Sequence, residues 1–361
     1  MFRQDRVGDV TCVTANAPYN RADHRSPTLT DPGRRCGGRR EQLVITFRRF
    51  RNTDPPALVE VWNESLTNRG SYPHPTAGLL ERWIFSRLHF DPNGLFVAVD
   101  SESSKILGWA LAGFGPTPDL ERQSPEVGVT CIVLVRPSAR RQGIGRGLVK
   151  ACEEYLTAKG AKTLLAGPRW PNAPFGFGLY GGSNCPGFLD SDPNAAPFMK
   201  ALGYVPAGRT LVFQKKLDQP LTLADPRFGM LRRRYETQML RAASVMTWWH
   251  DCVWGTLEPV EFRMIDKLTN IPAARAIVWE LEGYSWRWGA PSAGLFDVQV
   301  REDLRRQGLA KLLVAQVMRV LQDQFFGILE LQVAEEQPES VGLCKSLGFE
   351  SVDAGTAYRK A

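Results

Sequence analysis

Two short stretches share the run Arg-Arg-Gln-Gly followed by an aliphatic and a small residue, and these residues are suited to binding an anion. They are Arg140-Arg141-Gln142-Gly143-Ile144-Gly145 and Arg305-Arg306-Gln307-Gly308-Leu309-Ala310. Each follows a predicted strand ending in Val-x-Val and precedes a predicted helix, Leu148–Lys159 or Lys311–Gln324. At such a junction several backbone N–H groups lack partners, and with the helix dipole they attract a group such as pyrophosphate. Glycine and alanine let phosphate oxygens approach the backbone closely.

A single turn of this kind is weak evidence, because glycine turns between a strand and a helix also occur where elements pack tightly. Here the turn occurs twice: Gly308 lies 165 positions after Gly143, and the flanking residues keep that offset. Each copy also ends a late predicted helix on Leu-Gly-aromatic, at Leu202-Gly203-Tyr204 and Leu347-Gly348-Phe349. The repeat therefore predicts two domains of one architecture, each with a phosphate-binding turn.

The first copy alternates strand and helix patterns around its turn. Its predicted strands are Val44–Phe47, Gly94–Val99, Ile106–Phe114, Gly128–Val135, Thr163–Ala166 and Thr210–Lys216. Its predicted helices are Pro56–Leu66, Leu79–Phe90, Leu148–Lys159 and Ala195–Leu202. The loop 167–194 is rich in glycine, proline and aromatic residues, and a loop of this length in a compact domain is typical of a functional segment.

The second copy repeats this plan in shorter form. Its predicted strands are Glu261–Ile265, Gly294–Val300 and Ile328–Val333, and its predicted helices are Ala273–Leu281, Lys311–Gln324 and Ser340–Leu347. Only about a dozen residues separate Leu281 from Gly294, so we expect this copy to lack a helix and a pair of strands. The tryptophan-rich stretch Leu231–Trp254 is expected to be one helix that links the copies.

These patterns predict four segments. Residues 1–43 hold eight arginines and five acidic residues without a regular apolar period, which is typical of a disordered basic tail. Residues 44–217 form the first domain, 218–256 a helical linker and 257–361 the shortened second domain.

On the basis of these residues, the sequence resembles the GNAT superfamily of N-acetyltransferases. Both turns match the motif of that family, Gln/Arg-x-x-Gly-x-Gly/Ala. The tandem plan resembles that of mycothiol synthase and similar two-domain members. The resemblance covers about residues 44–217 and 257–361. It implies an α/β fold class: two tandem acyl-CoA N-acyltransferase folds, each a mixed central sheet flanked by helices, with the second copy shortened.

The resemblance further implies acetyl-CoA as co-substrate, with direct attack of an amine on the thioester and no metal. The acceptor would be an amine of a small molecule or peptide. In the family, Val135 and Val300 would lie at the strand bulge whose backbone holds the pantetheine arm. The expected donor-binding residues are Val133, Val135, Arg140, Arg141, Gln142, Gly143, Ile144, Gly145, Arg146, Val298, Val300, Arg305, Arg306, Gln307, Gly308, Leu309 and Ala310.

The positions where the family carries its general base do not hold one here. They are Val129 and Gly294, so the nearby carboxylates Glu126 and Asp297 become candidates that act through water. A charge at a strand end that faces solvent is the alternative for each.

The family's usual tyrosine acid is also replaced, by Met199 and Cys344. Tyr180 or Tyr204 is a substitute acid in the first copy, whereas Cys344 is interpreted as a small buried hydrophobe. The full plan and the long aromatic loop favour the first copy as the catalytic one. We therefore select Glu126, Tyr180 and Tyr204 as catalytic candidates. The missing residues favour an alternative, a non-catalytic acyl-CoA-binding or interaction protein.

Other classes of function find little support. The seven cysteines are scattered without a Cys-x-x-Cys pair, which argues against a disulfide framework and a zinc site and favours a reducing, cytoplasmic location. The longest apolar runs are far below the roughly 20 residues that cross a bilayer, so no membrane partner is expected. The formal charge of +7 is dispersed outside the tail, which makes a nucleic-acid partner unlikely.

Overall fold

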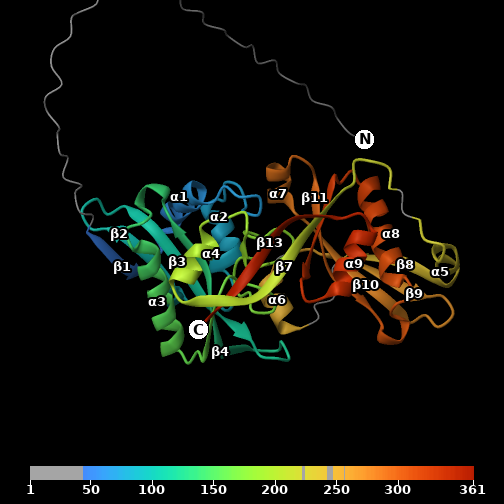
Figure 1. Ribbon diagram of the computed structural model, residues 1–361, viewed down its shortest axis with the longest axis horizontal. Helices are drawn as coiled ribbons and strands as arrows, with labels where there is room; N and C mark the ends of the chain where they lie inside the picture. The colour runs from blue at the N-terminus through green and yellow to red at the C-terminus, as the bar shows by residue number, and fades with distance from the viewer. Residues whose placement is uncertain (1–43, 222–223, 242–246, 256) are drawn as a thin grey trace, which may run out of the picture. The chain divides into compact units, whose positions relative to one another are not determined.

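The computed structural model describes residues 44–361 except 222–223, 242–246 and 256 (Figure 1). The predicted tail, 1–43, lies outside the described residues. The described helices and strands fall into two successive groups that follow the predicted repeat. We call β1 to β7 the first copy and α5 to β13 the second copy.

The first copy contains seven strands. They are β1 (Ile45–Arg49), β2 (Leu95–Asp100), β3 (Ile106–Pro116), β4 (Gln123–Val135), β5 (Thr163–Ala166), β6 (Phe188–Leu189) and β7 (Tyr204–Lys216). Its helices are α1 (Pro55–Ser65), α2 (Ala77–Leu80) continued by a π-helical turn (Glu81–Phe85), α3 (Ile144–Ala158) and α4 (Ala195–Ala201). Pro55 begins α1 because proline suits the first helical turn, where the backbone N–H is not needed. The Thr76 hydroxyl accepts from Leu79 N and begins α2.

The described part of the second copy contains six strands. They are β8 (Tyr235–Arg241), β9 (Val260–Asp266), β10 (Pro272–Glu280), β11 (Ser292–Val300), β12 (Ile328–Ala334) and β13 (Glu350–Lys360). Its α-helices are α5 (Phe228–Arg234), α6 (Trp248–Trp254), α7 (Glu282–Trp288), α8 (Leu309–Asp323) and α9 (Pro338–Ser346). No described helix is long and apolar enough to cross a bilayer.

Two predicted helices are wrong. Ala273–Leu281 is strand β10, which pairs with β9 on one side and β11 on the other. Its alanines favour a helix, but burial on both faces of a sheet overrides that weak preference. The stretch 231–254 is not one helix, because it contains β8, which pairs with β9 from Tyr235 to Arg241.

The second copy therefore has three antiparallel strands before its central strand. The pair of strands expected to be missing is present, because β8 and β10 both lie in stretches predicted to be helical. It is shortened in its helices instead. Between β1 and β2 the first copy places α1, α2 and the π-helical turn, whereas between β8 and β9 the described part of the second copy places only α6. The structural repeat begins before residue 257.

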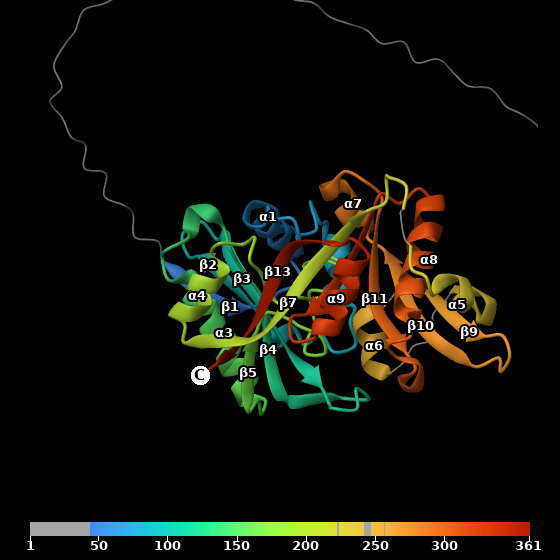
Figure 2. The same ribbon diagram turned by 45° about the vertical axis from the view of Figure 1, so that its right-hand side comes forward.

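The thirteen strands found in the described residues all belong to one sheet. Its order is β1-β2-β3-β4-β5-β13-β7-β12-β11-β10-β9-β8, with β6 paired to β13. The last strand of each copy thus reaches into the other: β13 lies between β5 and β7, and β7 lies between β13 and β12. Figures 1 and 2 show β7 and β13 crossing the middle of the molecule as a long antiparallel pair.

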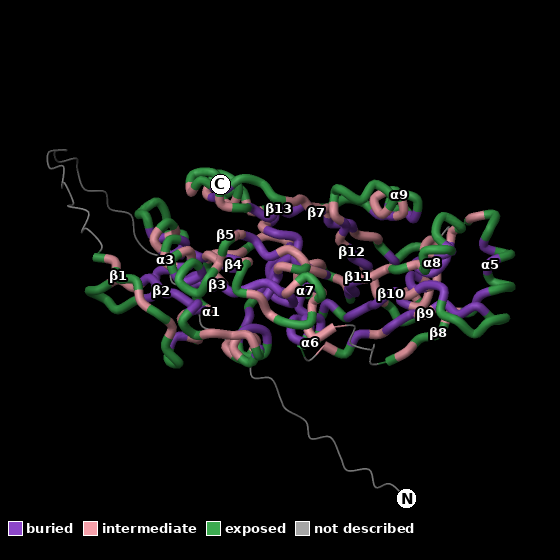
Figure 3. The backbone as a smooth tube through the Cα atoms, turned by 90° about the horizontal axis from the view of Figure 1, so that it is seen from below, coloured by how far each residue is buried: buried purple, intermediate pink, exposed green. Residues whose placement is uncertain are grey.

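Helices cover the two faces of this sheet unequally. Helices α3 and α8 each pack an apolar stripe on one face, through residues such as Leu148 and Leu313. On the other face a single cluster joins α1, the aromatic loop, α6 and part of β10. Figure 3 shows that the buried backbone is concentrated in the strands between these layers.

The aromatic loop 167–194 is part of this cluster. Phe175 and Phe177 are almost fully buried, and the ring of Phe177 stacks on Trp279 of β10 at a centroid distance of 4.9 Å. The loop therefore packs between the copies, and these two rings do not line an open acceptor site.

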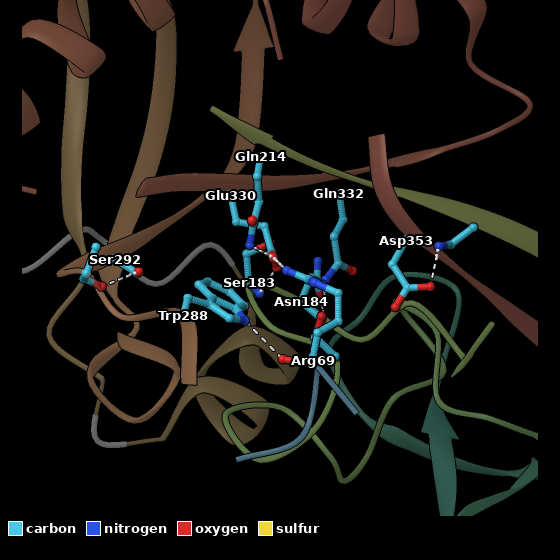
Figure 4. Close-up of polar contacts among 12 residues, drawn as sticks. Arg69, Ser183, Asn184, Gln214, Trp288, Ser292, Glu330, Gln332 and Asp353 are labelled. Atoms are coloured by element: carbon cyan, nitrogen blue, oxygen red, sulfur yellow. Dashed lines mark hydrogen bonds and ion pairs between the residues drawn. The ribbon is translucent and has the colours of Figure 1, made fainter. Parts of the chain in front are cut away.

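A fully buried carboxylate fixes the contact between the copies (Figure 4). Glu330 of β12 accepts from Arg69 Nη2 at 2.6 Å, Gln214 Nε2 at 2.8 Å and Ser183 N at 2.8 Å. Arg69 and Ser183 come from the first copy, and Gln214 lies on the exchanged strand β7. Gly182 has no room for a side chain, because an added Cβ would overlap Glu330. The hydrogen bonds to Glu330 and the absence of a side chain at Gly182 therefore both favour this contact between the copies.

Arg69→Ala is expected to lower the free energy of unfolding by about 3 kcal/mol, because it leaves a buried carboxylate without its cation. Urea unfolding of the purified chain measures this cost. In a Glu330→Gln background the same substitution should cost about 1 kcal/mol or less, since no charge remains to be compensated. An equal cost in both backgrounds would contradict a charge pair between the copies.

Candidate active site

The two glycine turns adopt the same backbone path. Gly143 precedes α3 with φ +82°, and Gly308 precedes α8 with φ +95°. The arginine two positions earlier also has positive φ, +63° at Arg141 and +66° at Arg306. No side chain caps either helix, so its first N–H groups stay available to an anion. The glycines are needed because other residues rarely adopt this conformation.

Each turn opens into a cavity. The cavity of the first copy has a volume of about 400 Å³ and that of the second about 980 Å³. Both run from the turn along the central strand, β4 or β11, to the late helix, α4 or α9. Of the predicted donor-binding residues, all line these cavities except Gln142 and Gln307.

The cavities form where parallel strands stop pairing. The pairing of β4 with β5 ends at Thr130↔Ala166, and that of β11 with β12 ends at Leu295↔Leu331. Beyond these points the central strand pairs only with β3 or β10, which leaves its other edge open to the cavity. A linear group such as a pantetheine arm fits this edge because the free backbone groups can form hydrogen bonds with it.

The strand bulge lies earlier than predicted. In β4 the extra residue is Cys131, because Leu111 pairs with Ile132 and Ala112 with Thr130. In β11 the extra residue falls at 297–298, between the pairs Ile277↔Phe296 and Arg275↔Gln299. Val135 and Val300 are regular strand residues opposite Gly108 and Ala274, so the bulge precedes them.

The bulge of the second copy carries a carboxylate. Asp297 has φ +53°, a conformation that aspartate tolerates better than most residues, and it lines the cavity. Its Oδ1 accepts from Gln299 Nε2 at 2.6 Å, and its Oδ2 forms an ion pair with Arg275 Nη2 at 3.0 Å. Burial raises the pKa of Asp297 despite the opposing charge of Arg275, and Glu261 of β9 raises it further.

An amide lies on the neighbouring strand of the sheet, β12. Gln332 of β12 lines the same cavity, and its Nε2 donates to the carbonyl oxygens of Gly181 at 2.7 Å and Asn184 at 3.1 Å. These bonds fix the orientation of the amide. Its Oε1 is buried and has no partner among the described residues, so a hydrogen-bond acceptor remains unused beside this cavity.

The first copy has no carboxylate at the matching place. Ile132, which corresponds to Asp297 by the repeat offset, is a buried apolar residue. Tyr180 does line the first cavity, and its hydroxyl oxygen accepts from Leu189 N at 3.0 Å. Burial raises the pKa of Tyr180, so its hydroxyl keeps a proton that it can donate.

The other two catalytic candidates lie outside both cavities. Glu126 is exposed, and a hydrogen bond from Lys162 Nζ at 2.5 Å lowers its pKa. Tyr204 is buried beneath α4 against Met199 and Tyr358, and burial raises its pKa. The structure therefore brings Tyr180 to a cavity but not Glu126 or Tyr204.

The two replaced acid positions line the cavities. Met199 lies in the first cavity and Cys344 in the second. Burial raises the pKa of Cys344 to about 12, so its thiol is uncharged at neutral pH. No group of three or more potential metal ligands occurs within the described residues.

Sequence reasoning considered both acids but selected Glu126 and not Asp297, and it overlooked Gln332. The signal that distinguishes the two acids is their distance from the end of the strand, because Asp297 is three residues before Val300 and Glu126 is nine before Val135. Gln332 had no local signal, since its role depends on β12 lying beside β11.

Comparisons with known proteins agree with this geometry. The model of the acetyltransferase (GNAT) family matches residues 56–174 and again 234–349. A tandem GNAT protein from the clavulanic acid biosynthesis pathway is similar in structure, with a TM-score of 0.59 at 17% identity, covering 88% of this chain and 98% of that one. A GCN5-related N-acetyltransferase from Sphaerobacter thermophilus has a TM-score of 0.59 at 16% identity, covering 88% and 95%. Among curated proteins, none matches this sequence.

The charges around Asp297 predict how its pKa responds to substitution. Carbon-13 NMR of the aspartate carboxyl groups, assigned with Asp297→Asn, should show a pKa above the ordinary value of about 3.9. Arg275→Gln should raise it further, because the favourable cation is lost. Glu261→Gln should lower it, because a neighbouring negative charge is lost. Shifts of the opposite sign would contradict the described arrangement.

Proposed function

Because the chain belongs to the acetyltransferase (GNAT) family, we propose that it transfers an acetyl group from acetyl-CoA to an amine and that transfer occurs in the second copy. The observation that carries the choice of copy is Asp297. It is a partly buried carboxylate at the bulge of the central strand, in the cavity that begins at the Gly308 turn.

The residues of both turns fit the donor. Each of the helices α3 and α8 begins at a glycine turn flanked by arginines, and its first N–H groups have no side-chain cap. Such a site is suited to binding a pyrophosphate. When bound, acetyl-CoA would supply an activated acyl group. In the second copy, Val298 and Val300 of β11 line the path from the turn towards Asp297.

Asp297 and Gln332 fit the needs of an amine. An ammonium ion cannot attack a carbonyl carbon, so one proton has to leave the nitrogen first. The Asp297 carboxylate accepts that proton, directly or through water, and its raised pKa makes it a better base than an ordinary aspartate. Gln332 Oε1 accepts a remaining N–H and holds the nitrogen in place. Arg275 and Gln299 position the carboxylate.

The first copy lacks this chemistry. Its bulge holds Cys131 and Ile132, and the aromatic loop fills the sheet face where the second copy has Asp297 and its partners. We propose that the first copy binds acetyl-CoA without transferring its acetyl group. Of the three residues selected as catalytic candidates, only Tyr180 lines the cavity of the first copy. The expectation that the first copy is catalytic therefore depends on Tyr180 alone. A chain that binds acyl-CoA in both copies and transfers from neither is the second candidate function, since the family's usual base and acid are replaced in both.

Asp297→Asn is expected to lower kcat/KM for acetylation about 100-fold or more, because the variant keeps the side-chain shape but cannot take a proton. The assay follows release of the CoA thiol with a panel of primary amines. In the parent chain kcat/KM should fall as pH decreases through the raised pKa of Asp297, since protonation removes the base. The variant should lack this pH dependence.

Tyr180→Phe is the matched control in the first cavity. It should leave kcat/KM within about threefold of the parent value, because the first copy is not the site of transfer. If Tyr180→Phe loses activity and Asp297→Asn keeps full activity, the first copy is the site of transfer and the proposal for the second copy is wrong. If no amine is acetylated although acetyl-CoA binds, the chain is a binding protein.

Gly143→Glu and Gly308→Glu should each remove one of two acetyl-CoA sites, because a carboxylate in the turn repels the pyrophosphate. Isothermal titration calorimetry of the parent and both variants measures the stoichiometry. Only Gly308→Glu should also abolish acetylation. A parent chain that binds no acetyl-CoA would contradict the proposed function.

A further inference from the structure

The phosphate-binding turn of the second copy has a neighbour that the first turn lacks. Arg227 precedes α5, in the segment that joins the copies, and it lies against Gly308. A Cβ added to Gly308 would come within 3.0 Å of Arg227 Cζ, 3.2 Å of its Nε and 3.3 Å of its Nη1. A Cβ added to Gly143 would meet nothing within 4 Å. Among the described residues, a guanidinium therefore lies against the glycine of the second turn but not against that of the first.

Arg227 is held in this place by a nearly buried carboxylate. Its Nε donates to Asp225 Oδ1 at 2.9 Å and its Nη2 to Asp225 Oδ2 at 2.8 Å. Asp225 Oδ2 also accepts from Lys311 Nζ, on the first turn of α8, at 3.2 Å. Asp225 thus connects the joining segment to the helix that begins at Gly308.

The arrangement leaves one edge of the guanidinium available. Asp225 engages Nε and Nη2, whereas Nη1 forms no hydrogen bond with Asp225 and lies near the glycine turn. Arg227 lines the second cavity and its side chain is 45% exposed, so a ligand in the cavity can reach it. Because Asp225 holds the guanidinium in one orientation, its remaining N–H groups are well placed to bind a phosphate group.

The positive charge at this end of the second cavity also favours a phosphate group. Arg227, Arg305, Arg306 and Lys311 all line this end of the cavity. Asp225 neutralises one of these four cations, and Glu302 lies 3.9 Å from Arg305 at the exposed edge. Cations therefore remain in excess around the N-terminus of α8, where the helix dipole adds further positive potential.

We infer that Arg227 is a donor-binding residue of the second copy, a clamp from the joining segment that contacts a phosphate group of coenzyme A. The inference rests on the proposed function, because it assumes that the second cavity receives the donor. Coenzyme A offers a pyrophosphate and a 3′-phosphate, and Arg227 contacts one of them. The clamp makes the two donor sites chemically unequal, since the first turn has no such side chain among the described residues.

The test compares coenzyme A with 3′-dephospho-coenzyme A by isothermal titration calorimetry. The full chain carries Gly143→Glu, so that only the second site remains. In this background Arg227→Gln should raise the Kd of coenzyme A roughly 5- to 20-fold, the loss of one charge-assisted hydrogen bond at a partly exposed site. Arg233→Gln is the control, because Arg233 is an exposed arginine of α5 that does not line the cavity. It should change the Kd less than twofold.

The two ligands identify the phosphate. If Arg227→Gln weakens both ligands equally, the clamp contacts the pyrophosphate. If it weakens only coenzyme A, the clamp contacts the 3′-phosphate. Either result supports the inference, provided that thermal unfolding shows both variants to be folded.

An Arg227→Gln variant that binds coenzyme A as tightly as its parent overturns the inference, and Arg227 then serves only its ion pair with Asp225. That result leaves the proposed function intact if the parent chain still binds coenzyme A and acetylates amines. Absence of coenzyme A binding in both the wild-type chain and the Gly143→Glu chain overturns the inference and the proposed function together.

Discussion

The exchange of β7 and β13 between the copies is the constraint on which the rest of the structure depends. Without β13 the first copy's sheet would end at the four-residue strand β5, and without β7 the second copy's sheet would end at β12. Each exchanged strand also pairs with the other over most of its length. Neither copy therefore has a complete sheet of its own, and a break at the centre would expose two unpaired edges.

The exchange also explains why a charge is buried between the copies. Glu330 lies on β12 directly beside Gln214 of β7, and its carboxylate is also enclosed by Gly182 and Ser183 of the aromatic loop. A carboxylate in such a position is unfavourable unless donors surround it. Arg69, Ser183 and Gln214 supply them from three separate segments, and this requirement selects one register of β7 against β12.

The features that the sequence predicts well are local. The glycine turns at Gly143 and Gly308 follow from residues within one strand end and one helix start, and both occur where expected. The strand β10 was mistaken for a helix because its alanines are helix formers and only its two neighbouring strands make it a strand. Strand β13 was not predicted, and no residue within Thr210–Lys216 or Glu350–Lys360 indicates which copy each will complete. Pairing between distant segments has no local pattern to reveal it.

The same distinction applies to the candidate site. The residues of the turns were identified from their spacing, but the choice among carboxylates required the sheet, because the register of β10 with β11 sets where the bulge falls. Once the bulge is placed, the two copies differ in what covers the face behind it. In the first copy Trp62 and Phe175 lie on that face, in the buried apolar cluster. In the second copy the charged residues Arg275, Glu261 and Arg263 share it with the apolar residues Ile277 and Trp279.

An apolar face stabilises a fold but leaves nothing to accept a proton, and a paired charged face costs stability but keeps a base ionisable. The bulge of the second copy therefore carries an ionisable group where the bulge of the first carries apolar residues. The exchanged strands β7 and β13 join both copies in one sheet, so this difference in chemistry lies within a single continuous structure.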